Sequence, residues 1–218
     1  MKYVLFDFNG TILDDTDVSI KCENLTIKHF KLNRPELSKQ EYLNIFTFPI
    51  KKYYENVGFD FNTYSFEEVG KYWFDCYESL KNEYAVFPEA IDFLKKSRNL
   101  GYQNILFSAS NIDALKKQLK ELNIEEYFDE VLGLCDIYAY SKEKIGLDFI
   151  ADKNPDDCIM IGDTLHDYEV ACKMNVKCYL IAKGHQSKEV LLSKCKDVYD
   201  DIRKVELWEL VNQEMFIN

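Results

Sequence analysis

The feature that most constrains the fold is a short apolar run, Tyr3-Val4-Leu5-Phe6, followed at once by the polar segment Asp7-Phe8-Asn9-Gly10-Thr11. An unbroken apolar run of this length is typical of a parallel strand that is buried on both faces. Ligands in open α/β sheets bind at the carboxyl ends of such strands, so Asp7 stands where chemistry is usually done. Gly10 permits a tight turn that brings backbone amides close to an anion, and Thr11 adds a hydroxyl group.

Further apolar runs recur along the chain with helical segments between them, at residues 104–107, 128–132, 159–161 and 177–182. This alternation predicts an α/β protein with a Rossmann-like parallel sheet. Helix-start signals stand at Pro88, Asn111, Ser141 and near His166, and Gly101 ends the first of these helices.

The interval from Thr16 to about Tyr84 holds no strand-like run and is rich in tyrosine, phenylalanine and lysine. It predicts an all-helical insertion. We therefore expect an α/β core domain from residues 1–15 and 86–218, with a helical cap domain at residues 16–85.

The composition narrows the class of protein. A net charge of −11 repels nucleic acid and anionic membranes, and no run approaches the ~20 apolar residues that span a bilayer. The chain begins directly with a strand and has no signal-peptide layout. Its seven cysteines form no C-x-x-C pair, which indicates reduced thiols rather than disulfides or a zinc site. We expect a cytoplasmic protein of undetermined oligomeric state, with an anionic substrate held by a metal ion or a placed lysine.

Residues 7–11 resemble the first motif of the haloacid dehalogenase superfamily, whose members are mostly phosphatases with an aspartate nucleophile. Three further motifs follow in the same order. Ser108, with Ala109 after it, closes an apolar strand as the second motif does. Lys142 matches the lysine of the third motif, and Lys144 is the alternative.

The fourth motif is the most specific. The strand at residues 159–161 leads into Gly162-Asp163, and a second acid, Asp167, follows four residues later. The resemblance covers the whole chain and implies a member of the phosphoglycolate-phosphatase-like branch with a helical cap.

The resemblance also implies a role for each residue. Asp7 would attack phosphorus and form an aspartyl phosphate. Asp7, the backbone carbonyl of Asn9 and Asp163 would hold a Mg²⁺ ion, while Asp167 would orient a metal-bound water or add a ligand. The phosphoryl group of a small phosphorylated metabolite would be held by the remaining motif residues, namely Gly10, Thr11, Ser108, Ala109 and Lys142.

Asn9 departs from the family pattern, which has an aspartate there that protonates the leaving group. An amide cannot deliver a proton at neutral pH, and general acid–base help is worth about 10²- to 10⁴-fold in rate. Three hypotheses follow: a Mg²⁺-dependent phosphatase without its usual acid, a catalytically weak protein that binds a phosphorylated ligand, and a dehalogenase or phosphonate hydrolase. The retained metal motif disfavours the third.

Other polar residues receive plainer interpretations. His29 and His185 are expected at the surface or in packing, and His166 in the first turn of its helix. Asp15, with its neighbour Asp14, is expected to cap the first helix of the insertion. The lysines at 51 and 52, within an aromatic cluster, are candidates to meet a substrate anion.

Overall fold

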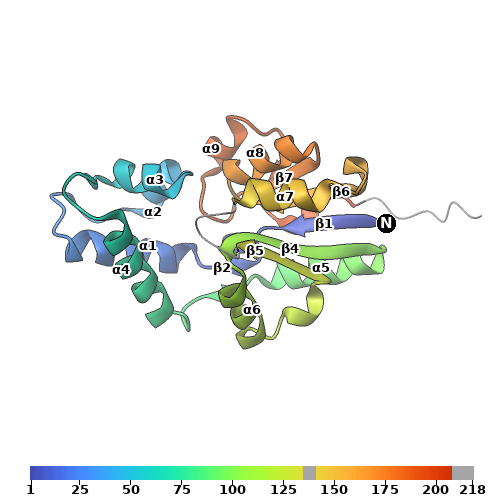
Figure 1. Cartoon of the computed structure of the whole chain (residues 1–218), viewed down its shortest axis with the longest axis horizontal. Coiled ribbons are helices and arrows are strands. Elements are labelled where there is room, and N and C mark those ends of the chain that lie inside the picture. The colour runs from blue at the N-terminus through green and yellow to red at the C-terminus, as the bar shows by residue number, and fades with distance from the viewer. Residues whose placement is uncertain (135–140, 208–218) are drawn as a thin grey trace, which may run out of the picture.

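The computed structural model describes residues 1–134 and 141–207, which fold around a central sheet with helices on both faces (Figure 1). Within these residues the sheet has six strands in the order β5-β4-β1-β6-β7-β8, all parallel. The predicted α/β class and parallel sheet are thus confirmed. The strands are β1 (Lys2–Phe6), β4 (Tyr102–Asn111), β5 (Glu130–Leu134), β6 (Cys158–Gly162), β7 (Lys177–Ile181) and β8 (Val198–Tyr199).

Alternate strand residues face two separate apolar cores. Phe6 of β1 packs with the side chains of α5 (Pro88–Asn99) and α6 (Ile112–Glu121), whereas Leu5 faces the opposite core. That second core is covered by α7 (Lys142–Ile150), α8 (Leu165–Met174) and α9 (Lys188–Leu192). Because both faces are buried, β1 reads as an unbroken apolar run in the sequence.

The helix-start signals act as expected. Asn111 accepts hydrogen bonds from the backbone N–H groups of Asp113 and Ala114, and Ser141 accepts one from Lys144. The sequence pattern missed β8 because a two-residue strand carries no periodicity. It also placed the start of β5 two residues early. In the part of the chain that the structure describes, three short 3₁₀ helices join these elements: η1 (Glu125–Tyr127), η2 (Pro155–Asp157) and η3 (Ile202–Lys204).

The helical insertion leaves the core through β2 (Leu13–Asp14) and returns through β3 (Ala85–Val86), which pair antiparallel. We call residues 16–85 the cap. The cap has an apolar core of its own (Tyr42, Tyr53, Tyr54, Val57, Phe59 and Val69 among its members), and Figure 1 shows its helices grouped beyond one end of the sheet. The division into two domains stays a prediction. The helices of the cap are α1 (Thr16–His29), α2 (Lys39–Ile45), α3 (Ile50–Val57) and α4 (Phe66–Ser79).

Among the described residues, no helix is long and apolar enough to cross a membrane. The described cysteines are free thiols; Cys135 lies outside the described residues.

Candidate active site

A cavity of about 670 Å³ lies where the carboxyl ends of the central strands meet the cap. The core contributes Asp7 from the end of β1, Ser108 and Ala109 from β4, and Lys142 from the start of α7. The segment after β6 adds Asp163, Thr164 and Asp167, and cap side chains close the other side. The parallel sheet therefore gathers residues that are far apart in the sequence at one edge, as expected for an open α/β fold.

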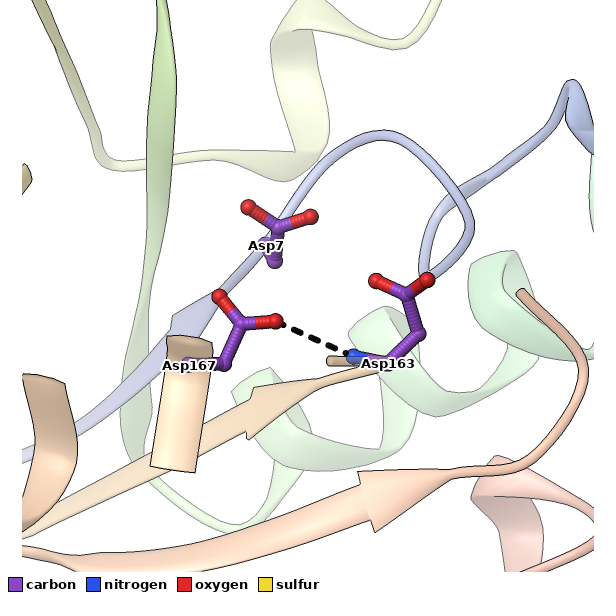
Figure 2. Close-up of side chains that lie close together, drawn as sticks. All are labelled: Asp7, Asp163 and Asp167. Atoms are coloured by element: carbon purple, nitrogen blue, oxygen red, sulfur yellow. Dashed lines mark hydrogen bonds between the residues drawn. The ribbon is translucent and has the colours of Figure 1, made fainter. Parts of the chain in front are cut away.

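Three carboxylates form the polar centre of this cavity. Asp7, Asp163 and Asp167 each offer an oxygen, and these oxygens lie within 4.8 Å of one another. Figure 2 shows the three side chains grouped together and the hydrogen bond from the Asp163 N–H to Asp167. Both Asp163 and Asp167 are buried, so the cluster is not an ordinary solvated acidic surface.

Lys142 is the cation of the cluster. Its ammonium group contacts the Asp7 carboxylate and lies 2.6 Å from Oδ1 of Asp167. Burial by itself lowers the pKa of Lys142, but the carboxylates of Asp167 and Asp7 outweigh it and raise the pKa above its usual value. Lys144, the alternative considered from the sequence, instead pairs with Asp148 on the exposed face of α7.

One lysine does not neutralise the buried carboxylates of Asp163 and Asp167 together with the half-buried carboxylate of Asp7. Burial raises the pKa of Asp163 and of Asp7 above their usual range. By contrast, burial by itself raises the pKa of Asp167, but Lys142 and hydrogen bonds outweigh burial and lower the pKa. Its Oδ2 accepts hydrogen bonds from the Thr164 hydroxyl (2.7 Å) and from the Thr164 backbone N–H (3.0 Å). The chemistry of the donor set, with excess negative charge on Asp7 and Asp163, fits a divalent cation at this point.

The Asn9 side chain is held in a buried hydrogen-bond network. Its Nδ2 donates to Oδ2 of Asp15 (2.7 Å) and to the Tyr77 hydroxyl (3.0 Å). Tyr77, from cap helix α4, in turn donates to Asp15 (2.8 Å). The expectation that Asp15 caps α1 is wrong: it occupies the first position before the helix but makes no side-chain cap. Its carboxylate is used by the network instead.

His185 completes this network, so of its two expected places, at the surface or in packing, the structure excludes the surface. It is 6% exposed, its Nε2 lies 3.2 Å from Oδ1 of Asp15, and its Nδ1 lies 2.9 Å from the hydroxyl of Tyr42 in the cap. Burial by itself lowers the pKa of His185, but Asp15 outweighs it and raises the pKa to about 9. The available signal was its place just beyond the β7 strand end, where site residues gather.

Gly10 and Thr11 support the cluster rather than line the cavity. The Gly10 N–H donates to the Leu13 carbonyl (2.9 Å) and to Oδ1 of Asp15 (3.0 Å). The anion close to this amide is therefore the Asp15 carboxylate, and contact of Gly10 with a substrate anion stays a prediction. A Cβ at this glycine would lie 2.3 Å from Oδ2 of Asp163. The Thr11 hydroxyl donates to Oδ1 of Asp163 (3.2 Å).

The cap lysines lie away from the cavity. Lys52 pairs with Glu55 and Lys51 packs over the ring of Phe61, because α3 turns its apolar face inward and its lysines outward. Their expected contact with a substrate anion is therefore wrong. His29 is exposed and stacks on Tyr72, as a packing histidine should.

His166 lies in the first turn of α8, as expected. It also lines the cavity and stacks on Phe48 of the cap, with ring centroids 4.5 Å apart. The sequence pattern did not indicate this second contact, because Phe48 lies more than one hundred positions before His166 in the chain.

Comparison with known proteins agrees with this geometry. Residues 4–181 match a family model described as haloacid dehalogenase-like hydrolase. The pyrophosphatase PpaX of Bacillus velezensis is 23% identical over 173 residues, which cover 75% of each chain.

Solved structures show the same fold. A haloacid dehalogenase-like family protein of Streptococcus pneumoniae, SP0104, has a TM-score of 0.74 at 20% identity and covers 91% of this chain and 92% of its own. A predicted phosphoglycolate phosphatase of Haemophilus somnus has a TM-score of 0.66 at 17% identity, with 92% and 94% coverage. The family model thus confirms the resemblance to this superfamily, and the solved structures show the same fold.

The packing around Asp163 gives a prediction. A Cβ at Gly184 would lie 2.1 Å from Oδ2 of Asp163, so Gly184→Ala must displace that carboxylate. We expect Mg²⁺ affinity, measured by calorimetry, to fall about 10- to 100-fold, as for other changes that misplace a metal ligand. Gly70→Ala in α4 is the control, because its added methyl meets nothing within 4 Å. Unchanged Mg²⁺ affinity in Gly184→Ala would contradict the assignment of Asp163.

Proposed function

The chain belongs to the haloacid dehalogenase-like hydrolase family, and we propose that it is a Mg²⁺-dependent phosphatase of a small phosphorylated metabolite. The observation that carries this proposal is the cluster of Asp7, Asp163 and Asp167 around Lys142 at the ends of β1 and β6. Phosphoryl transfer needs an in-line nucleophile and charge neutralisation, and little else from the protein. The pyrophosphatase name of the Bacillus relative also supports a phosphorylated substrate.

In this mechanism a carboxylate oxygen of Asp7 attacks phosphorus. A new O–P bond forms while the bond from phosphorus to the leaving oxygen breaks, and an aspartyl phosphate results. Water then attacks that phosphorus, which releases inorganic phosphate and restores the Asp7 carboxylate. Lys142 and Ser108 would hold the phosphoryl oxygens, so that the charge of the transferred group would be offset throughout.

Asp7, Asp163 and the backbone carbonyl of Asn9 would hold the Mg²⁺, and Asp167 would orient one of its waters. Oxygen ligands of this kind are those that Mg²⁺ prefers, and the ion would supply charge neutralisation for the substrate phosphate. The cytoplasmic location expected from the cysteines belongs to the same proposal.

Asn9 sets the rate that this site can reach. Its amide donates to Asp15 and Tyr77 and cannot protonate a leaving oxygen. Esters with good leaving groups therefore suit the site best. The same observation favours a second function, a phospho-ligand-binding protein with weak turnover, which would bind phosphate esters tightly and hydrolyse them slowly whatever the leaving group.

The nucleophile gives the first test of the phosphatase. Asp7→Asn is expected to abolish phosphate release from p-nitrophenyl phosphate, since an amide oxygen is a poor nucleophile. Asp14→Asn, at an exposed position of β2, should keep full activity. Retention of more than a small fraction of turnover by purified Asp7→Asn would rule out the covalent mechanism.

The two lysines of α7 form a matched pair. Lys142→Ala leaves Asp7 and Asp167 without their cation and should reduce kcat far more than Lys144→Ala, whose lysine pairs with Asp148. Steady-state kinetics on p-nitrophenyl phosphate measure both. An equal or reversed loss would show that Lys142 has no role in phosphoryl transfer.

Restoring the missing acid requires two substitutions. Asn9→Asp alone places a second carboxylate against the buried carboxylate of Asp15. Two like charges at this distance repel each other, so the two groups cannot both be ionised at low cost. The exchange Asn9→Asp with Asp15→Asn keeps one carboxylate and one amide in contact. It is expected to raise kcat/KM for alkyl phosphates, by at most about 10²- to 10⁴-fold.

Two checks accompany this exchange. Because Asn9 precedes Gly10 and is prone to deamidation, mass spectrometry of the peptide must show an intact amide in the unsubstituted protein. Melting temperatures must show that both proteins are folded. A folded double variant that is no faster than the parent on alkyl phosphates would overturn the missing-acid argument.

A further inference from the structure

The cavity is strongly asymmetric between its core side and its cap side. Lys142 and His185 stand near the acidic cluster, whereas the cap wall is aromatic. No lysine or arginine of residues 16–85, all of which the structure describes, lines the cavity. Of the remaining lining residues, Lys117 on α6 is exposed and lies 3.8 Å from Glu121. Aromatic residues of the cap wall include Phe46, Phe48, Tyr53, Tyr54, Trp73 and Phe74.

Two polar groups of this aromatic wall lie near each other and lack a well-formed hydrogen bond. Glu23 on α1 is 0% exposed and Tyr53 on α3 is 2% exposed, and both line the cavity. Neither carboxyl oxygen of Glu23, nor the hydroxyl of Tyr53, makes a hydrogen bond of normal geometry to a described residue, although the two side chains are near enough to influence each other's pKa. A buried polar group without a partner is costly, and native proteins rarely keep one without a reason. Their place in the cavity wall supplies a reason, because a ligand there can satisfy them.

The state of Glu23 indicates which ligand group would fit. Burial raises the pKa of Glu23 to about 8, with the nearby Tyr53 hydroxyl and Arg34 only moderating the rise. At neutral pH the carboxyl group is therefore mainly protonated and can both donate and accept a hydrogen bond. The Tyr53 hydroxyl can do the same. An uncharged hydrogen-bonding group suits this pair, whereas an anion would be desolvated there without a cation.

We propose that the substrate is a phosphate monoester of an uncharged alcohol with an aromatic or similarly flat apolar body, whose distal hydrogen-bonding group is bound by Glu23 and Tyr53. The proposal rests on the phosphatase function above, which places the phosphate at Asp7. The aromatic wall would stack against the body of such a substrate, and 670 Å³ is typical of sites for ligands of that size. Pyrophosphate and phosphoglycolate carry a second anionic group, which this wall would desolvate without offering a cation.

The test uses three phosphates that share one aromatic body: benzyl phosphate, its 4-carboxamide and its 4-carboxylate. We expect kcat/KM to be highest for the carboxamide and at least about tenfold lower for the carboxylate, the factor that 1.4 kcal/mol of lost binding represents. The difference should lie in KM, because the distal group is remote from the reacting phosphorus. Inorganic pyrophosphate and 2-phosphoglycolate should rank with the carboxylate.

Variants assign the effect to the two residues. Glu23→Leu and Tyr53→Phe should each remove the preference for the carboxamide over benzyl phosphate, while Glu23→Gln, which still donates and accepts, should retain it. Acetyl phosphate is too small to reach the cap wall and should be hydrolysed equally by all of them. Glu68→Leu, at an exposed position of α4, is the control for adding an apolar residue to the cap.

The outcomes separate this proposal from the phosphatase function. Turnover of acetyl phosphate by the parent and not by Asp7→Asn supports the phosphatase. If the carboxylate, pyrophosphate or phosphoglycolate is then preferred, or if Glu23→Leu changes no substrate ranking, the inference about the cap wall is overturned. If acetyl phosphate is not hydrolysed, the phosphatase function fails. Calorimetric binding of the three benzyl phosphates then decides the inference by the same order of affinity.

Discussion

The structure of this site depends on one electrostatic constraint: three carboxylates meet at the ends of two neighbouring strands with a single lysine between them. Lys142 contacts Asp7 and Asp167, and Asp163 is left with hydrogen bonds from Thr11 and from the backbone of His185. Buried charges are tolerated only when they are paired or bind a metal. The interactions that hold this arrangement together are therefore the same ones that, in the proposed function, would bind a phosphoryl group and its cation.

A second network joins the loop after β1 to the cap. Asp15 accepts from Asn9 and Tyr77, and it pairs with His185, which lies against Tyr42. Two of these partners come from cap helices α2 and α4 and one from the loop after β7. The position of the cap and the conformation of the loop that carries Asp7 are thus coupled through buried hydrogen bonds. Buried hydrogen bonds are stronger than exposed ones, and a buried polar group that loses its partner is costly.

The cavity separates two kinds of recognition. Charge is concentrated at the strand ends, where a phosphate of any ester would be bound. The cap presents aromatic surface with the buried polar groups of Glu23 and Tyr53. In a chain of net charge −11, Lys142 and His185 would offset the charge of the phosphate in the proposed function, and selection among esters would fall to the cap.

The sequence by itself determined the α/β class, the main strands and the grouping of Asp7, Lys142, Asp163 and Asp167, because buried strands, helix caps and strand-end polar residues are local patterns. It also indicated, from the family pattern, that Asn9 stands where an aspartate is usual. Only the tertiary structure decided that Asp15 serves Asn9 rather than α1, that His185 is buried in the site, and that the cap lysines face away. Each of these depends on contacts between residues far apart in the chain, and a side chain's partner across such a distance leaves no periodic signal in the sequence.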